Sequence, residues 1–406
     1  MIRLKRPRNV LFLSTILLLY HWVFGLPSFD LVVQRYLIGG ETLGSDNGPT
    51  SPGIRTGYDI SIPWKKRIVA VGDLHGDLAH TLRVLRAAKI VDHRAQWIGK
   101  TATLIQTGDI VDRGTDTIAL YRLFDTLRVQ AAQTGGEVIS LLGNHEFMNA
   151  MGDWRYVTKE DIATFHGEQN RRRAMASGWI GQTWLANYTI AARAVYPPFF
   201  GSALDDTLGS SSLLAVHGGI HPSWSDIARI NRVGTSLMSR IVNARIPSSM
   251  ELPRDSSEEE RDFYSPNGPV WYRGYALDSD TDDVICEVAE EVLRRTNTTR
   301  MVIGHTPNFS RIVSRCRGKI IIIDTGISSA YGGVLSALEI VYTLTPPGDS
   351  EIDETLPTIS SRKKSTKGEE RPAKLVERET VRAIYEGRSE VLVKREMSID
   401  VPDALK

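Results

Sequence analysis

The sequence RIVAVGDLHGD, residues 67–77, decides the fold class. Its first half, Arg67–Val71, is a short apolar run rich in β-branched residues and predicts a strand. Glycines on both sides of Asp73 and His75 then allow a tight turn, and a helical pattern follows from Leu78 to Ala88. A strand, a glycine turn and a helix in this order are typical of an α/β protein built from layered sheets and helices.

The same order of elements continues along the chain. We expect a second helix at about residues 117–130 and further strands at residues 103–107, 137–142, 213–216, 300–303, 320–323 and 336–341. The last two strands have no long helix between them, so part of the sheet system should be antiparallel. From Met151 to Phe200 the pattern is mostly helical with several tryptophans, which predicts an insertion packed beside the sheet.

Composition excludes some classes of protein. The 406 residues can form one large domain or two small ones, and the 41% apolar share is ample for a core. A formal net charge of +1 gives no indication of a basic surface that would bind nucleic acid. The run Arg171-Arg172-Arg173 is too short to change this and is interpreted as a solvated helix face. Two cysteines, Cys286 and Cys316, cannot form a zinc cluster; they make one bridge or are two small buried apolar residues.

The N-terminal sequence predicts entry into the secretory pathway. Basic residues at positions 3, 5, 6 and 8 precede an apolar run from Val10 to Leu26, which indicates a signal peptide or signal anchor over residues 1–26. Such a segment would allow membrane anchoring, with the remainder of the chain translocated. A mitochondrial presequence is the competing interpretation. Sequons at Asn187, Asn297 and Asn308 are compatible with glycosylation in the lumen.

The remaining boundaries follow from local composition. Residues 27–57 are expected to be a linker, because Gly, Ser, Thr and Pro dominate its second half. The main folded domain is expected to span residues 58–345. Residues 346–406 are expected to be a mostly disordered charged tail, within which Val381–Lys394 alternates enough to form a hairpin.

Five segments at predicted strand ends carry the chemistry. They are GDLHGD (72–77), GDIVDRG (108–114), GNHE (143–146), HGG (217–219) and GHTP (304–307). Any one of them could be a helix cap or a turn. Together they hold four of the nine histidines of the chain. Because side chains at i and i+2 of an extended chain point the same way, Asp73 and His75 can bind one metal. A mixed set of carboxylate, amide and imidazole ligands suits Mn, Fe or Zn.

These segments resemble the metallophosphoesterases, specifically the phosphoprotein phosphatase branch. The stretches LLGNHEFMNAMGDWRYV (141–157), GPVWYRGY (268–275) and IDTGISSAYGG (323–333) resemble the Shewanella-like protein phosphatase subgroup. The resemblance covers about residues 67–341. It implies an α/β metallophosphoesterase fold, in which a central β-sandwich of mixed sheets is flanked by helices and carries a helical insertion.

The resemblance also implies two divalent or trivalent metal ions and a role for each site residue. The implied ligands of the first ion are Asp73, His75 and Asp109. Those of the second are Asp109 as a bridge, Asn144, His217 and His305. His145, oriented by Asp112, would be the general acid, and Arg113 and Arg273 would hold the phosphate. A hydroxide bridging the ions would attack in line, and His145 would protonate the leaving oxygen.

Three functions remain open at this stage. The leading expectation is a phosphatase acting on phosphoproteins at Ser, Thr or Tyr. The block Gly304–Pro307 also occurs in dinucleotide-polyphosphate hydrolases of the same superfamily, so a nucleotide substrate is the alternative. The third is a tethered binding protein with a vestigial site, although each ligand position here has a competent residue. The chain has Ser328–Gly332 in place of the SAPNY-type segment of the usual eukaryotic phosphatases, so regulatory-subunit binding and toxin sensitivity are not carried over.

Overall fold

The computed structural model describes residues 63–196, 211–244, 250–277, 282–347 and 374–400. All of them belong to one compact unit, Arg55–Lys406. The expected signal segment and linker therefore lie outside the described residues. Within the described ranges, no helix is both long enough and apolar enough to cross a membrane.

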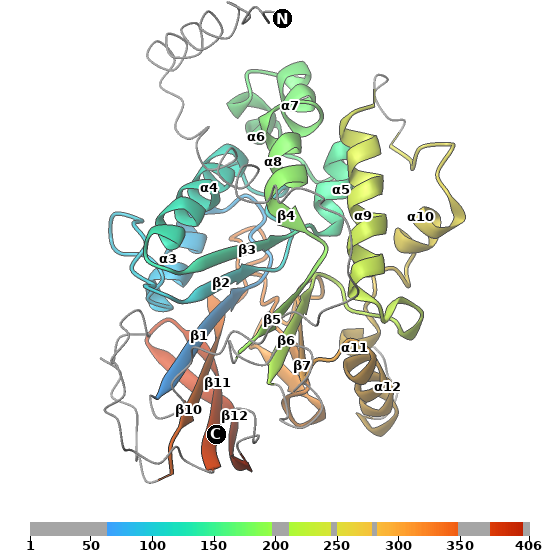
Figure 1. Ribbon diagram of the computed structural model, residues 1–406. Helices are drawn as coiled ribbons and strands as arrows, with labels where there is room; N and C mark the ends of the chain where they lie inside the picture. The colour runs from blue at the N-terminus through green and yellow to red at the C-terminus, as the bar shows by residue number, and fades with distance from the viewer. Residues whose placement is uncertain (1–62, 197–210, 245–249, 278–281, 348–373, 401–406) are drawn as a thin grey trace, which may run out of the picture. The chain divides into compact units, whose positions relative to one another are not determined.

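Two β-sheets form the centre of the described unit (Figure 1). The larger sheet has the strand order β12-β11-β10-β1-β2-β3-β4, and the smaller has the order β5-β6-β7-β9-β8. The strands of the larger sheet are β1 (Trp64–Val71), β2 (Thr103–Gln106), β3 (Glu137–Leu141), β4 (Tyr188–Thr189), β10 (Ser336–Thr345), β11 (Lys374–Tyr385) and β12 (Arg388–Asp400). Those of the smaller sheet are β5 (Ala191–Val195), β6 (Ser212–Val216), β7 (Arg300–Ile303), β8 (Val313–Arg315) and β9 (Ile320–Ile322).

Strand direction places the functional loops together. β1, β2 and β3 run parallel, as do β6, β7 and β9. Because the carboxyl ends of parallel strands lie at one edge of a sheet, each group of three delivers its following loops to the same place. β10 pairs antiparallel with β1, so the expectation of a mixed sheet is confirmed.

The strands separate two apolar cores by simple alternation. In β1, Ile68 and Ala70 face the smaller sheet and pack with Leu213 and Val302, which makes the layer between the sheets. Val69 and Val71 point to the opposite face and belong to the second core, which lies under the helices. Since both faces of the central strands are buried, these strands are apolar almost throughout.

Helices cover the outer faces of both sheets (Figure 1). Beside the larger sheet lie α3 (Leu78–Ala87) and α4 (Thr117–Gln133); α5 (Asn144–Met151) follows β3. Beside the smaller sheet lie α9 (Ile227–Val242), α11 (Gly274–Leu277) and α12 (Asp282–Arg295), with α10 (Glu258–Phe263) next to α9. Two short 3-10 helices, η1 (Pro222–Trp224) and η2 (Cys316–Gly318), complete the described elements.

The expected helical insertion is present but shorter than predicted. Its helices are α6 (Lys159–Thr164), α7 (Glu168–Met175) and α8 (Trp179–Asn187), and β4 and β5 follow them within the stretch that was expected to be mostly helical. Arg171 of α7 also differs from its expected solvated position. It is fully buried, donates from Nε to Asp161 at 2.8 Å and lies over the ring of Trp154. An ion pair and an aromatic ring can compensate a buried guanidinium, which a charge run in the sequence does not reveal.

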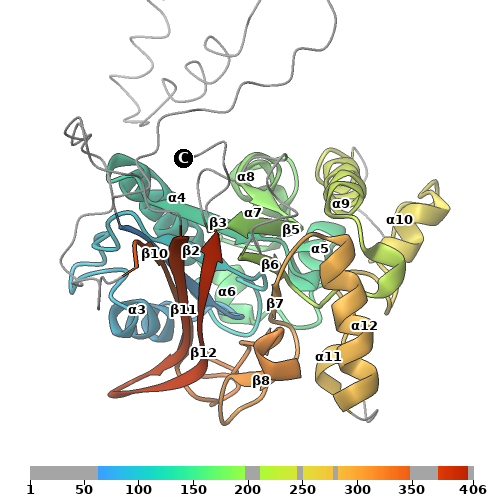
Figure 2. The same ribbon diagram turned by 60° about the horizontal axis from the view of Figure 1, so that its bottom comes forward.

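Part of the C-terminal region that was expected to be disordered is folded. Residues 348–373 lie outside the described residues, but β11 and β12 form a long hairpin, and β11 pairs with β10 along its length (Figure 2). The predicted hairpin is thus present and longer than expected. Alternate residues of β11 are buried, so this strand belongs to the sandwich. The domain therefore extends well beyond residue 345.

A disulfide bridge joins Cys286 of α12 to Cys316 of η2. The two cysteines are 30 residues apart in sequence. The bridge ties the outer helix of the smaller sheet to the connection between β8 and β9. Of the two roles that the sequence left open for this pair, the structure shows the bridge.

Candidate active site

Close backbone contact between glycines brings the first two loops together. A Cβ on Gly114 would lie 2.2 Å from the carbonyl oxygen of Gly76, and Gly76 itself has φ +65°. The amide of Gly114 donates to the carbonyl of His75 at 3.0 Å. The loops after β1 and β2 can approach this closely only because both positions lack a side chain.

Several site residues adopt a left-handed backbone conformation, which is uncommon for residues other than glycine. They are His75, Asp109, Asp112, Arg113 and His305, with φ between +42° and +74°. Such conformations cost free energy and persist where the surrounding contacts fix them, as they often do at functional sites. Here the strand ends and the glycine contacts fix the loops, so the side chains are held in preset directions.

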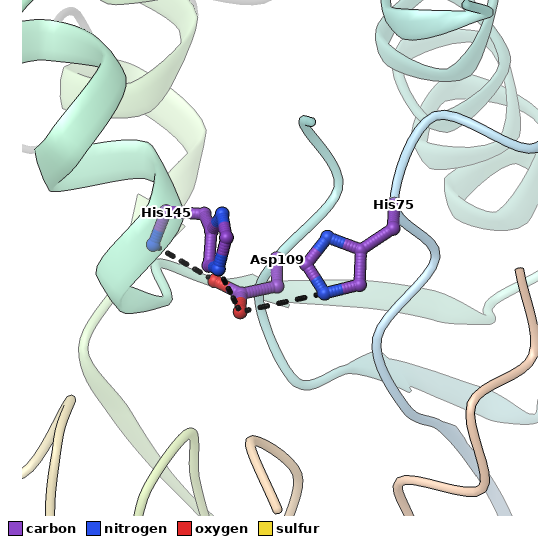
Figure 3. Close-up of side chains that lie close together, drawn as sticks. All are labelled: His75, Asp109 and His145. Carbon is purple, nitrogen blue, oxygen red and sulfur yellow. Dashed lines mark hydrogen bonds and ion pairs between the residues drawn. The ribbon is translucent and has the colours of Figure 1, made fainter. Parts of the chain in front are cut away.

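Asp109 is the centre of the site (Figure 3). Its Oδ2 lies 3.9 Å from Nε2 of His75, 3.8 Å from Nε2 of His145 and 3.3 Å from Nε2 of His217. Burial alone raises the pKa of Asp109, but His217 and His145 outweigh it and hold the pKa well below its usual range. This carboxylate is therefore ionised and faces imidazoles on more than one side.

The orientation of each histidine leaves one ring nitrogen for a ligand. Nδ1 of His75 donates to the carbonyl of Val111 at 2.9 Å, and Nδ1 of His217 donates to Thr107 at 2.8 Å. Both Nε2 atoms then point toward Asp109, and Nε2 of His217 also lies beside Oδ1 of Asn144. Burial lowers the pKa of His75 to about 4, so this imidazole is neutral and able to bind a cation at physiological pH.

Asn144 and His305 complete the neighbourhood of His217. Oδ1 of Asn144 lies 2.9 Å from Nε2 of His217, and the His217 and His305 rings are 4.8 Å apart. Burial, followed by the charge of His217, lowers the pKa of His305 well below its usual range. These residues follow β3, β6 and β7, so three strand ends from both sheets meet here.

Asp73 lies next to a carboxylate that the sequence interpretation missed. Asp73 accepts the backbone N–H of His305 at 3.2 Å, and Asp324 follows β9 at the same edge of the sheet. Burial, then the charges of Asp324 and Asp109, raises the pKa of Asp73 well above its usual value, and burial raises that of Asp324 to about 6. The rule that selected the other residues, a polar group after a parallel strand, would have selected Asp324 as well.

His145 and Asp112 form a buried pair. Nδ1 of His145 lies 2.5 Å from Oδ2 of Asp112, whose other oxygen accepts from Nδ2 of Asn149 at 2.9 Å. Burial lowers the pKa of His145, but Asp109 and Asp112 outweigh it and raise the pKa above its usual value. The predicted contact between these two residues is thus present, and it favours the protonated imidazole.

Glu146 is a second residue whose role the sequence interpretation missed. Its carboxylate accepts the backbone N–H groups of Asp109, Ile110 and Gly143 at 2.8–2.9 Å. It is fully buried. A single carboxylate therefore fixes the loop that carries Asp109 to the start of α5, which carries Asn144 and His145.

The two arginines predicted to bind phosphate are far apart in the sequence, but both contact loops of the site. Arg113 follows Asp112 directly, and its backbone N–H donates to the carbonyl of Tyr156 at 2.9 Å. Nη1 of Arg273 donates to the carbonyl of His305 at 2.8 Å and to Oγ1 of Thr306 at 3.0 Å. Arg273 is therefore tied to the loop after β7 rather than to a surface carboxylate.

The side chains fit a metal centre. Ligand atoms of His75, Asp109 and His145 lie within 4.8 Å of one another, and so do those of Asp109, His217 and His305. The shared Asp109 is the position predicted to bridge two ions. Asp73 belongs to neither group, and His145, predicted as the acid, belongs to the first. Burial, followed by the charges of Asp324 and Asp109, raises the pKa of Asp73, and a bound cation would oppose all three effects.

Comparison with known proteins agrees with this geometry. Residues 66–309, more than half of the chain, match the family described as calcineurin-like phosphoesterase. The chain belongs to this family. It is 40% identical to an uncharacterized protein of Schizosaccharomyces pombe over 71% of this chain and 81% of that one. It is 27% identical to Shewanella-like protein phosphatase 1 of Plasmodium berghei over 67% of this chain and 69% of that one.

Comparison with solved structures agrees as well. The cold-active protein tyrosine phosphatase solved at 1.1 Å is 25% identical, with a TM-score of 0.54 over 80% of this chain and 78% of that one. The protein-tyrosine phosphatase of a psychrophilic Shewanella species has a TM-score of 0.56 at 24% identity, covering 80% of each chain, and supports the fold. The predicted fold class and family are thus confirmed, and the chain is a phosphoester hydrolase with His and Asp side chains positioned for a metal site.

Proposed function

We propose that this chain is a metal-dependent phosphatase that removes phosphate from phosphoproteins. The observation that carries the proposal is the position of Asp109, whose Oδ2 lies 3.9 Å from Nε2 of His75 and 3.3 Å from Nε2 of His217, with the His145–Asp112 pair directly beside it. A site for two Mn, Fe or Zn ions next to a protonated imidazole suits hydrolysis of a phosphate monoester.

Each part of the reaction has a candidate group in this chain. Asp73, His75 and Asp109 would hold one ion, and Asp109, Asn144, His217 and His305 the other. When bound, two such cations activate water for in-line attack and neutralise charge on the phosphoryl oxygens.

The other groups act on the substrate itself. Arg113 and Arg273 would bind the phosphate oxygens, for which the planar guanidinium is well matched. His145 would give its proton to the leaving oxygen. Asp112 keeps that imidazole oriented and favours its protonated form.

Phosphotyrosine is the first substrate to test. Two features support it: the similar cold-active enzyme carries the name protein tyrosine phosphatase, and Phe309, which is 51% exposed, lies beside the ring of Tyr331 at 5.9 Å. An aromatic leaving group could pack on such a surface. Phosphoserine and phosphothreonine peptides belong in the same panel, because the sequence does not separate the three.

The test is a substrate panel with the Mn²⁺-loaded full-length protein. Turnover of phosphopeptides without turnover of diadenosine tetraphosphate is expected, and the reverse result would favour a nucleotide hydrolase. Asp109→Asn should lose both activity and stoichiometric metal, because it removes the ligand shared by both groups. Turnover of neither substrate, by wild-type protein with full metal content, would support a binding protein with a vestigial site.

We also propose that the protein enters the secretory pathway through its N-terminal segment. The Cys286–Cys316 bridge supports this, because disulfides persist in oxidising compartments. The sequon residues Asn187 and Asn297 are exposed, so glycosylation is sterically possible there. Glycosidase treatment and cell fractionation test the proposal; an unglycosylated protein that co-purifies with mitochondria would refute it.

A further inference from the structure

Two tyrosine rings pack against the guanidinium of Arg113. Its Cζ lies 4.6 Å from the ring centroid of Tyr156 and 4.5 Å from that of Tyr331. Tyr156 belongs to the loop after α5, and Tyr331 to the segment between β9 and β10. Two distant parts of the chain therefore converge on one arginine side chain.

A hydrogen bond from Nε does not fix the side chain of Arg113. Among the described residues, Nε of Arg113 is buried and has no hydrogen-bond partner. The backbone of Arg113 is fixed, with φ +65° and its N–H bonded to Tyr156. The side chain beyond it has the two aromatic rings as its close neighbours, and aromatic faces attract a cation.

The same two rings also touch the histidines of the site. The Tyr156 ring lies 5.1 Å from that of His145, and the Tyr331 ring lies 5.3 Å from that of His75. The two histidine rings are in turn 4.8 Å apart. The tyrosines thus connect the guanidinium to the two histidines that lie on either side of Asp109.

Core packing does not explain both tyrosines. The side chain of Tyr156 is 38% exposed, and Tyr331 is half-buried. An aromatic residue placed only to fill the core would be enclosed, as Tyr121 and Tyr196 are. The exposed edge of Tyr156 beside a charged side chain is instead typical of a binding surface.

We propose that Tyr156 and Tyr331 are positioning residues, which hold the Arg113 guanidinium ready for the substrate phosphate. This inference rests on the proposed function, in which Arg113 binds phosphate. A free arginine side chain loses much rotamer entropy when it binds a ligand, and a side chain that is already ordered loses less. Preorganisation of this kind raises affinity without a new contact to the ligand.

The experiment measures binding of inorganic phosphate to the Mn²⁺-loaded full-length protein by calorimetry. Tyr156→Leu and Tyr331→Leu should each weaken phosphate binding about three- to tenfold, because the guanidinium becomes mobile. Tyr156→Phe and Tyr331→Phe keep the rings and should stay within about twofold of wild type. Metal content and thermal unfolding confirm that each variant is folded.

A double-mutant cycle separates positioning from general structural support. In an Arg113→Ala background, Tyr331→Leu should have no further effect on phosphate affinity, because the group that it orders is gone. The matched control is Arg388→Ala, which removes a guanidinium from the ring of Tyr385 in the β11–β12 turn and should leave phosphate affinity unchanged.

The outcomes are distinct. Equal losses from Tyr331→Leu with and without Arg113, or equal losses in the Phe and Leu variants, would overturn the positioning role. Failure of the wild-type protein to bind phosphate at all would refute the proposed function, and the positioning role with it.

Discussion

Replacing His145 by Asn should impair catalysis according to the leaving group of the substrate. An alkoxide leaves poorly without a proton, so loss of the acid should reduce kcat/KM for alkyl phosphates about 10²–10⁴-fold. At about 1.36 kcal/mol for each factor of ten, this is roughly 2.7–5.4 kcal/mol of transition-state stabilisation. An aryl phosphate such as p-nitrophenyl phosphate has a good leaving group and should lose less than about tenfold.

The geometry of His145 limits the side effects of this substitution. Its Nδ1 lies 2.5 Å from Asp112, and an Asn amide can still donate a hydrogen bond to that carboxylate. Asp112 also keeps its bond from Asn149. The fold and the metal content should therefore persist, which thermal unfolding and metal analysis check. His93→Asn, at an exposed loop histidine, is the matched control and should leave both rates unchanged.

The pH profile gives an independent readout of the same role. Asp109 and Asp112 raise the pKa of His145 against the effect of burial, which favours the protonated imidazole. Activity on alkyl phosphates should fall as pH rises through this raised pKa, because the acid is then deprotonated. The alkaline decline should vanish in His145→Asn. Equal losses on alkyl and aryl phosphates, with the decline unchanged, would show that His145 is not the acid.

Two further predictions concern stability. Replacing Cys286 and Cys316 by Ser should lower the free energy of unfolding by about 3–4 kcal/mol, since their separation of 30 residues sets the loop entropy. In a denaturant titration, wild-type protein in reductant should match the variant. Equal free energies of unfolding for the variant and the oxidised wild type would count against the bridge. Glu146→Gln should lower the free energy of unfolding by about 2–4 kcal/mol and reduce metal content, because three backbone N–H groups share this carboxylate. Wild-type stability in the denaturant titration, together with full metal content, would contradict the role assigned to Glu146.

One rule explains why residues far apart in the sequence could be grouped as metal-site candidates. The loops after β1, β2, β3, β6 and β7 all begin at predicted strand ends. Parallel strands then bring those ends together, whatever their distance along the chain. Asp324 follows the same rule after β9 and was missed only because no role was transferred to it. That residue shows that the rule extends beyond the motifs that first suggested it.

Residues that act through packing were not predictable in this way. Tyr156 and Arg171 belong to the insertion, where neither periodicity nor spacing shows which aromatic ring meets which cation. β4 and β5 fell within a stretch predicted to be mostly helical, since β4 has only two residues and the alanines of β5 give no clear alternation. In both cases tertiary contacts decide the outcome, and local propensity is too weak to oppose them.

The C-terminal hairpin illustrates the same limit most clearly. The face of β11 that points into the sandwich carries Leu375 and Val381, but also the buried acids Glu377 and Glu379. Two acids interrupt the apolar alternation, so the pattern alone indicates an exposed segment. Glu379 is compensated by Arg300 at the start of β7, with one bond of 3.2 Å, and Glu377 by Arg395 at 3.1 Å. A buried carboxylate is tolerated only with such a partner, and a partner in the other sheet is invisible to any rule that considers one strand at a time.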